Sequence, residues 1–539
     1  MGRIRWVAAA AAAVLSLAGL VAAQEGDFSA QVDAAASTRA EKSRQGRLSY
    51  QLDQLADAAE RGRALSDRGG RLPRYVDAAS GRVTAIIELK QGARVEDLSR
   101  AVAGAGGSVE GAVLDHVKVS VPPGGLRALA ADPSVRVMRQ PFYAEPKVVS
   151  QGVKVMKADQ YINKTHDDGT GVTVAVMDGP TFGGARNLLG SELPSDTVAT
   201  PFVQNGSFSE VHGTACAEIV HDVAPGAKLI LGGFSGDEVA WAQQIQLLVN
   251  SGADIITHSL GFDNVAMPNG KHFFAQVADA VNSSGVLFVT AAGNEGQKYY
   301  QGPWTDKDKD QFLEFKNKTE NLPIYVDGGD YIRLRWDDSF GSSNHDYDLY
   351  IVTGNGDIIA KSEGLQSGSQ DPFEEADIPA GVSGKVYAIV HHDPSSPLKS
   401  NQKFWLYVGG AGIVDSAFRS VPGSLTLPAD AKGAVAVGAV AYNTKKLEVY
   451  SSQGPTSDNR IKPDLVAPDK VVTVSYGSSF AGTSAATPHA AGAAALILSH
   501  TPSLSVSALR SALQKATSSG GSKRDNKQGY GLIDLSKAK

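Results

Sequence analysis

The chain of 539 residues has a single cysteine, Cys216, and no long block of basic residues. One thiol excludes any disulfide within the chain, so stability must come from packing, with bound ions as a further possibility. The formal net charge of −6 is small for this length, which argues against nucleic acid as a partner. Beyond the N-terminus, no stretch combines the length and the uninterrupted apolarity that a membrane span requires.

The N-terminus has the three parts of a secretory signal peptide. Arg3 and Arg5 precede an apolar run from Val7 to Leu20, and small residues follow up to Ala23. This pattern predicts cleavage after Ala23 and a secreted protein, extracellular or periplasmic, with no membrane attachment after cleavage. A retained membrane anchor is the alternative.

The length predicts several domains, and the composition, 42% hydrophobic and 20% charged, is that of soluble globular proteins. Residues 24–70 are polar, with Leu48, Leu52 and Leu55 at helical spacing, which predicts a helical segment. Residues 83–139 predict a small ferredoxin-like domain of order β-α-β-β-α-β. Its expected strands are 83–89, 108–113, 116–121 and 135–139, and its expected helices are 95–103 and 125–131.

Ser484 lies near the start of a predicted apolar helix. The block 482–492 reads Gly-Thr-Ser-Ala-Ala-Thr-Pro-His-Ala-Ala-Gly and continues into an apolar stretch at 493–498. Unpaired backbone N–H groups and the positive end of the helix dipole would stabilise negative charge developing on this serine. Taken alone, the residue fits either a nucleophile or an ordinary helix N-cap.

Three other polar residues lie at the ends of predicted strands or at the start of a predicted helix. Asp178 directly follows the apolar strand 171–177, at the sheet edge where open α/β folds bind ligands. His212 opens a helix in the segment Val-His-Gly-Thr-Ala-Cys-Ala-Glu, and Asn294 follows the strand 286–290. Taken singly, Asp178 is better explained as a turn aspartate and His212 as a surface or packing histidine, and Asn294 fits a turn asparagine.

Together these segments resemble the signatures of the subtilisin-like serine peptidases, the subtilases. The aspartate, histidine and serine segments occur in the family's order. The resemblance implies an α/β fold in which a subtilisin-like parallel sheet has helices on both faces. It also implies a serine endopeptidase in which Ser484 is the nucleophile, His212 is the base and Asp178 orients His212. Asn294 would then donate to the oxyanion.

The same resemblance implies how a protein or peptide substrate binds. The backbone of Ser259, Leu260 and Gly261 would pair with an extended substrate as an added strand. The pocket for the residue before the cut would be flanked by Ala291, Ala292 and Gly293. This chemistry requires no metal or organic cofactor.

The small domain at 83–139 resembles the propeptide of subtilases, which assists folding and blocks the active site until it is removed. We therefore expect a zymogen that is processed in the linker between Glu145 and Gly152. An unrelated binding domain of the same common fold is the alternative. The expected division is a signal peptide at 1–23, a propeptide at 24–148 and a catalytic domain in two parts, 149–296 and 421–539.

The catalytic domain is interrupted, because the interval from Asn294 to Ser484 is more than twice that from His212 to Asn294. Residues 297–420 alternate strand-like runs with Gly, Asp, Ser and Pro turns, which predicts an inserted antiparallel β-sandwich. Its clearest runs are 331–336, 347–352, 385–390 and 404–408. Calcium stays possible but unassigned, since Asp337, Asp338, Asp346 and Asp348 are either ligands or ordinary charged turn residues.

The chain departs from the family pattern in two motifs. The residue after the catalytic aspartate is usually Ser or Thr, and Gly179 here predicts a less firmly held Asp178. In the histidine motif, Ala215 replaces a second histidine and Glu218 replaces a glycine. These changes predict an altered rate or pH optimum without removing a catalytic residue.

Two reactive side chains near these motifs are expected to be non-catalytic. Cys216 occupies the position of the free thiol of proteinase K-like subtilases and is expected to be buried. His489, within the serine block, corresponds to a structural residue of the family.

Two other functions fit parts of the pattern. A sedolisin-like acid peptidase would need glutamate where His212 stands and aspartate in place of Asn294. A secreted binding protein on a catalytically idle subtilase scaffold is the alternative from another class. The four intact motif residues favour the peptidase, which we expect to act as a monomer.

Overall fold

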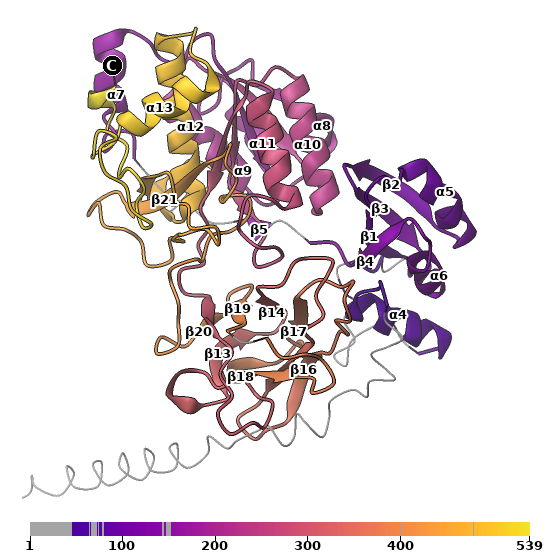
Figure 1. Ribbon diagram of the computed structural model, residues 1–539. Helices are drawn as coiled ribbons and strands as arrows, with labels where there is room; N and C mark the ends of the chain where they lie inside the picture. Colours follow the sequence, from indigo (N-terminus) through magenta and orange to yellow (C-terminus); the bar gives the residue numbers. More distant parts are fainter. Residues whose placement is uncertain are drawn as a thin grey trace, which may run out of the picture. The chain divides into compact units, whose positions relative to one another are not determined.

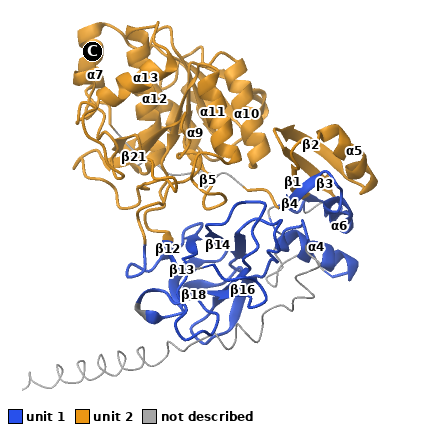
Figure 2. Ribbon diagram, viewed as in Figure 1, with its two compact units in different colours: residues 1–83, 122–139, 300–419 blue, residues 84–121, 140–299, 420–539 orange. Residues whose placement is uncertain are grey.

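The structure is a computed structural model that describes residues 46–63, 65, 73, 75–77, 80–142, 145–146, 152–399, 401–477 and 479–538. The predicted signal peptide, the first part of the predicted propeptide and most of the predicted processing linker lie outside these residues. Among the described helices, none is long and apolar enough to cross a membrane. The chain divides into two compact units (Figure 2). Unit 1 comprises residues 1–83, 122–139 and 300–419, and unit 2 comprises 84–121, 140–299 and 420–539.

Unit 2 is built on a seven-stranded parallel sheet of order β22-β21-β11-β9-β6-β8-β7. Strand β21 of this sheet is labelled in Figure 1. Its central strands are continuous runs of buried residues, as expected where both faces of a sheet are covered. The strands are β6 (Thr173–Asp178), β7 (Val198–Ala199), β8 (Lys228–Gly233), β9 (Ile255–His258), β11 (Leu287–Ala291), β21 (Val435–Ala441) and β22 (Leu465–Asp469).

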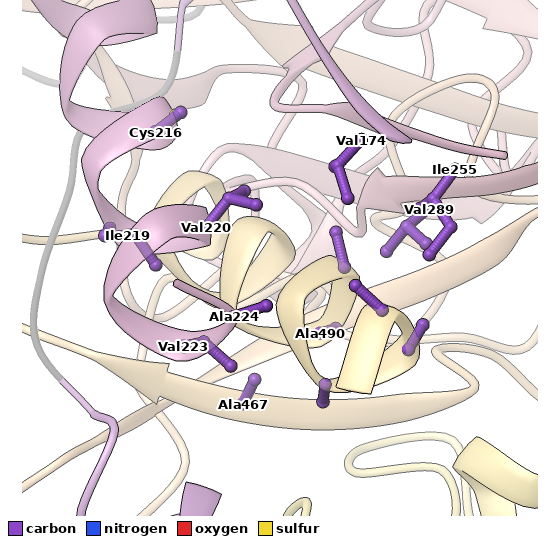
Figure 3. Close-up of a cluster of buried hydrophobic side chains, with 14 of the residues drawn as sticks. Val174, Cys216, Ile219, Val220, Val223, Ala224, Ile255, Val289, Ala467 and Ala490 are labelled. Atoms are coloured by element: carbon purple, nitrogen blue, oxygen red, sulfur yellow. The ribbon is translucent and has the colours of Figure 1, made fainter. Parts of the chain in front are cut away.

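Helices cover both faces of this sheet, which confirms the predicted α/β fold. Val174 and Val176 of β6 share a buried cluster with α9 and α12 (Figure 3), and the alternate residues of the strand point to the other face. Helices α10 and α11 lie side by side, with α10 against β6 and β8. The helices are α7 (Ala158–Thr165), α8 (Pro201–Asn205), α9 (His212–Val223), α10 (Glu238–Asn250), α11 (Phe273–Ser283), α12 (Thr483–His500) and α13 (Val506–Lys515).

The predicted β-α-β-β-α-β order is present along the chain, and all four strands have the predicted bounds. In unit 2, β3 lies between β1 and β2 and runs antiparallel to β2. In unit 1, residues 47–49 pair with β4 and lead into α4 (Tyr50–Glu60). The elements are β1 (Val83–Leu89), α5 (Val95–Gly104), β2 (Ser108–Val113), β3 (His116–Val121), α6 (Leu126–Ala130) and β4 (Val135–Arg139).

Residues 300–419 of unit 1 form two antiparallel sheets on a shared core, which confirms the predicted β-sandwich. The sheet orders are β12-β19-β14-β17 and β16-β15-β18-β13-β20. Trp336 of one sheet and Leu349 of the other are fully buried in the same cluster. The strands are β12 (Tyr299–Pro303), β13 (Leu322–Asp327), β14 (Tyr331–Trp336), β15 (Tyr347–Val352), β16 (Ile358–Ser362), β17 (Phe373–Asp377), β18 (Ser383–His392), β19 (Lys403–Val408) and β20 (Ile413–Val414).

Candidate active site

Asp178 and His212 form a short buried pair at the carboxyl edge of the parallel sheet. Asp178 is the last residue of β6 and is fully buried, and His212 is the first residue of α9. Nδ1 of His212 lies 2.6 Å from Oδ2 of Asp178. A hydrogen on Nδ1 that is donated to this carboxylate leaves the Nε2 lone pair to accept a proton. The pair therefore favours the tautomer that a general base needs.

The second oxygen of Asp178 is held by the turn that follows it. Oδ1 accepts hydrogen bonds from the N–H of Gly179 at 2.8 Å and from Oγ1 of Thr181 at 2.8 Å. Oγ1 of Thr181 in turn accepts from the N–H of Gly213 at 3.0 Å. Gly179 lacks a hydroxyl, as the sequence shows, but the structure supplies one from two residues further on.

Ser484 is the second residue of α12 and is fully buried. Its Oγ donates to the backbone oxygen of Ser259 at 3.0 Å. Pro488 has no N–H for the helical bond to the Ser484 carbonyl. That carbonyl instead accepts from Oγ of Ser259 at 2.8 Å and lies 3.7 Å from Sγ of Cys216. Cys216 is one helical turn beyond His212, so these contacts bring the nucleophile candidate and the base candidate to the same edge.

The turn before Ser484 is fixed by Gly482 and Asp469. Gly482 has a φ of 146°, which residues with a side chain rarely adopt. Its N–H donates to Oδ2 of Asp469 at 2.9 Å. Asp469 is fully buried, and burial raises its pKa to about 6. Its Oδ1 has no hydrogen-bond partner among the described residues, which leaves the charged form poorly compensated.

Asn294 is oriented by Thr483, the residue before Ser484. Oδ1 of Asn294 accepts from the N–H of Thr483 at 2.8 Å and from Oγ1 of Thr483 at 3.1 Å. Oγ1 of Thr483 also accepts from the N–H of Gly293 at 3.2 Å. With Oδ1 held in this way, the amide plane is set and Nδ2 carries the donors. This geometry suits an oxyanion donor beside the serine.

The segments expected to bind substrate lie at the ends of two neighbouring strands of unit 2. The two-residue strand β10 (Leu260–Gly261) follows β9 through Ser259. It pairs antiparallel with β5 (Glu145–Pro146), so that this backbone already accepts an added strand. Ala291 ends β11 and leads through Ala292 to Gly293, which has a φ of 109°.

Thr426 lies between the glycines of these two segments. A Cβ on Gly261 would lie 1.9 Å from Oγ1 of Thr426, and a Cβ on Gly293 would lie 3.0 Å from its Cβ. Thr426 is fully buried, and its N–H donates to the oxygen of Ala292 at 3.0 Å. Its Oγ1 has no hydrogen-bond partner within the described part of the chain. The side chain therefore occupies the space between the expected pocket walls, and no sequence motif indicated it.

Glu218, which stands where the family has glycine, binds the loop between β23 (Val471–Val472) and β24 (Ser479–Phe480). Its carboxylate accepts from the N–H of Val474 at 2.6 Å and from the N–H of Ser475 at 3.0 Å. Burial raises the pKa of Glu218. The ring of Phe480 meets the His212 ring edge-on, with 5.4 Å between their centroids. Glu218 thus fixes a loop that ends against the catalytic histidine candidate.

The other reactive groups near the site are buried and held inert. Burial raises the pKa of the Cys216 thiol well above its usual value, which disfavours a nucleophilic thiolate. Nδ1 of His489 donates to the oxygen of Ala485 at 2.7 Å, and burial lowers the pKa of His489 to about 4. Burial likewise lowers the pKa of His258 to about 3. These residues stay neutral near pH 7.

The carboxylates considered as calcium ligands have protein partners. Asp337 and Asp338 both pair with Nζ of Lys399, at 3.1 and 3.2 Å. Oδ2 of Asp348 lies 3.3 Å from Nδ1 of His391, and Oδ1 of Asp346 accepts from the N–H of Gln366. Among the described residues, a tighter acidic group with oxygens within 4.8 Å of one another is formed by Asp306, Asp308 and Asp310.

Comparison with known proteins agrees with this geometry. The model of the Subtilase family matches residues 169–322 and 399–531, on either side of most of the β-sandwich. The chain belongs to the subtilase family. Membership of this family makes the protein a subtilisin-like serine endopeptidase.

Similar proteins match part of this subtilase. Subtilisin Savinase from Lederbergia lenta is 31% identical over 200 residues, which are 35% of this chain and 67% of the relative. An alkaline protease from Alkalihalobacillus alcalophilus is also 31% identical over 200 residues, but they cover 48% of its length. The solved structure of the Clostridium perfringens CspB protease has a TM-score of 0.51 at 16% identity, covering 72% of this chain and 98% of that one, and supports the fold.

Proposed function

We propose that this subtilase is a secreted serine endopeptidase that hydrolyses proteins or peptides through an acyl-enzyme, with Asp178, His212 and Ser484 as the catalytic triad. The observation that carries the proposal is the 2.6 Å contact between His212 and the buried Asp178, at the edge where Ser484 lies in the first turn of α12. A carboxylate that holds an imidazole in one tautomer prepares it to take a proton from a serine.

In the proposed mechanism, the hydroxyl of Ser484 leaves the Ser259 carbonyl and donates to Nε2 of His212. Oγ attacks the carbonyl carbon of the substrate while His212 takes the proton. Asp178 stabilises the imidazolium that forms. His212 then gives the proton to the leaving amine, and a water that it deprotonates hydrolyses the acyl-enzyme.

The oxyanion of each tetrahedral intermediate would be bound by Nδ2 of Asn294 and by the backbone N–H of Ser484. The second N–H of a helix has no acceptor within that helix, and it lies at the N-terminus, which is the positive end of the helix dipole. Side chains and backbone groups supply every step, so we expect no metal or organic cofactor in the chemistry.

We further propose that residues 24–148 are a propeptide and that processing occurs between Glu145 and Gly152. Its support is the antiparallel pairing of β5 with β10, where the backbone of the substrate is expected to bind. In unit 2, Nζ of Lys118 also pairs with Asp237, the N-cap of α10, at 2.9 Å. The catalytic domain would comprise 149–296 and 421–539, with the insert at 297–420.

Secretion and the mature state remain part of the proposal. We infer a signal peptide at 1–23, export of the zymogen and a mature monomer that is free of the membrane and does not bind nucleic acid. A binding protein on an idle scaffold is the competing function, and it would have no reactive serine.

A fluorophosphonate probe tests the proposed function. Processed wild-type protein should be labelled, and the Ser484→Ala protein should not. N-terminal sequencing should find the wild type shortened to a residue between 145 and 152, and the Ser484→Ala protein uncut there. Absence of labelling on processed wild type would refute the peptidase and favour the binding protein.

A further inference from the structure

Two side-chain amides join residues 46–51 to the inserted β-sandwich within unit 1. The amide nitrogen of Gln51, in the first turn of α4, donates to the backbone oxygen of Glu375 in β17 and lies 3.5 Å from Oγ of Ser362. From the insert, the amide of Gln370 donates to the backbone oxygen of Gly46 at 2.5 Å. Because each amide bonds to main chain on the other side, the pair fixes the register of the contact.

Tyr50 extends the same contact towards buried carboxylates. Its ring is half-buried, and burial raises the pKa of its hydroxyl, which the nearby carboxylates of Glu363 and Glu374 raise further. Both glutamates are buried in the insert. Oε1 of Glu374 accepts from the N–H of Gly364 and from the amide of Gln366, each at 2.8 Å.

Arg136 of β4 reaches the insert at a second place. Its Nη1 lies 3.2 Å from Oδ1 of Asp371, which also accepts from the N–H of Gly341 at 2.6 Å. Gly341 has a φ of 77°, and a Cβ there would lie 2.3 Å from Nη1 of Arg136. The left-handed backbone favours glycine at this position, and a side chain there would displace the guanidinium.

These contacting residues belong to the small N-terminal domain. The N–H of Met138 in β4 donates to the oxygen of Arg47 at 2.8 Å, and the N–H of Ser49 donates to the oxygen of Met138 at 2.9 Å. Arg127 of α6 pairs with Asp53 of α4 at 2.8 Å. The insert therefore holds a folded part of the propeptide candidate.

We propose that the inserted β-sandwich is a docking surface for the propeptide and retains it after the linker has been cut. The docking surface consists of Gly341, Ser362, Gln370, Asp371 and Glu375. The inference rests on the proposed function in one respect, because residues 24–148 are a propeptide only if the chain is processed. Cleavage and release are then separate steps, and the insert sets how fast activity appears after cleavage.

The test uses the full chain with Ser484→Ala and a site for a specific protease placed in the linker at 147–151. Cleavage is then independent of the protein's own activity. After the cut, the rate at which the N-terminal fragment leaves a C-terminally tagged remainder is measured by size-exclusion chromatography over time. Arg136→Asp and Gln370→Ala weaken the contact from opposite sides. Arg94→Asp is the matched control, since Arg94 pairs with Asp97 of α5.

Docking predicts that Arg136→Asp speeds release about tenfold, as expected for a lost charge-assisted hydrogen bond. Gln370→Ala should speed it by roughly threefold for a lost neutral bond, and Arg94→Asp should leave it unchanged. Adding Asp371→Arg to Arg136→Asp reverses the ion pair, and it should restore part of the lifetime of the complex between the N-terminal fragment and the remainder. Equal release rates for wild type, Arg136→Asp and Gln370→Ala would overturn the docking surface. Fluorophosphonate labelling of the wild type is a separate readout, so failure of the proposed function is recognised independently.

Discussion

The hydroxyl of Thr181 donates to Asp178 at 2.8 Å and accepts from the backbone N–H that follows His212 at 3.0 Å. One threonine thus joins the turn after β6 to the first residues of α9. A hydroxyl that bridges a buried carboxylate and a helix start restricts both partners of the Asp178–His212 pair.

Replacing Thr181 by valine keeps its shape and removes the hydroxyl. The buried carboxylate of Asp178 then loses a donor, which costs about 1.5–3 kcal/mol for a charged acceptor. We expect kcat/KM to fall roughly 10- to 100-fold on a peptide substrate, with Thr181→Ser restoring most of it. A Thr181→Val enzyme with wild-type kcat/KM would mean that Asp178 does not need this donor.

The Asn294→Ala variant should lose an oxyanion donor. Removal of one such donor lowers kcat about 10²- to 10³-fold while KM changes little, because the interaction forms mainly in the transition state. Steady-state kinetics on a peptide ester and a peptide amide check this. A change in KM alone would assign Asn294 to substrate binding.

Thr426 should restrict the residue before the cut to small side chains, because its own side chain lies against Gly261 and Gly293. Thr426→Gly should raise kcat/KM for a substrate with phenylalanine at that position, relative to alanine, by at least about tenfold. Matched chromogenic peptides measure the ratio. If the ratio of kcat/KM for the phenylalanine and alanine substrates is the same in both proteins, Thr426 does not line the pocket for the residue before the cut.

Asp469 should make stability depend on pH. Its folded-state pKa is raised to about 6 by burial, above the usual value near 4, so the folded state binds the proton more tightly than the unfolded state. Stability from this group is therefore greatest below pH ~4 and falls as pH rises through about 6, by about 3 kcal/mol at most.

Two Ser484→Ala proteins, one that keeps Asp469 and one that also carries Asp469→Asn, test this through their unfolding free energies between pH 4 and 7. The difference between the two should change by up to about 3 kcal/mol over that range, in favour of the amide variant at high pH. Asp196→Asn, at an exposed position, serves as the control. A difference that stays constant with pH would show that Asp469 does not titrate in this window.

The fold was predictable where local patterns are strong. Strands such as 83–89 and 331–336 read as runs of strand-forming residues, and β1 and β14 have those bounds. The helix that carries Ser484 was predictable from its apolar composition, since α12 is buried over most of its length. Strand 171–177 was displaced by one or two residues, because the pattern does not mark where pairing begins.

The motif residues of the candidate site were predictable from the sequence, but the residues that hold them in place were not. Thr181 stands beyond Pro180, so inspection of the position after Asp178 overlooks it. Thr426 and Asp469 carry no motif that distinguishes them from ordinary turn residues. The role of Thr426 follows from its contact with Gly261, which is far away in the sequence, and the role of Asp469 follows from its hydrogen bond with Gly482, beyond β23 and β24.

The sequence by itself determined the order of the aspartate, histidine, asparagine and serine segments, the strands and helices that carry them, and the presence of an insert. These are local properties, encoded by apolar periodicity and by short motifs. Only the tertiary structure decided which hydroxyl holds Asp178, which side chain lies between Gly261 and Gly293, and which surface of the insert meets residues 46–51. The last two contacts join segments that are distant in the sequence, and their approach is set by the packing of the whole core. The first depends on the path of the turn after Asp178, which the N–H of Gly213 holds through Thr181.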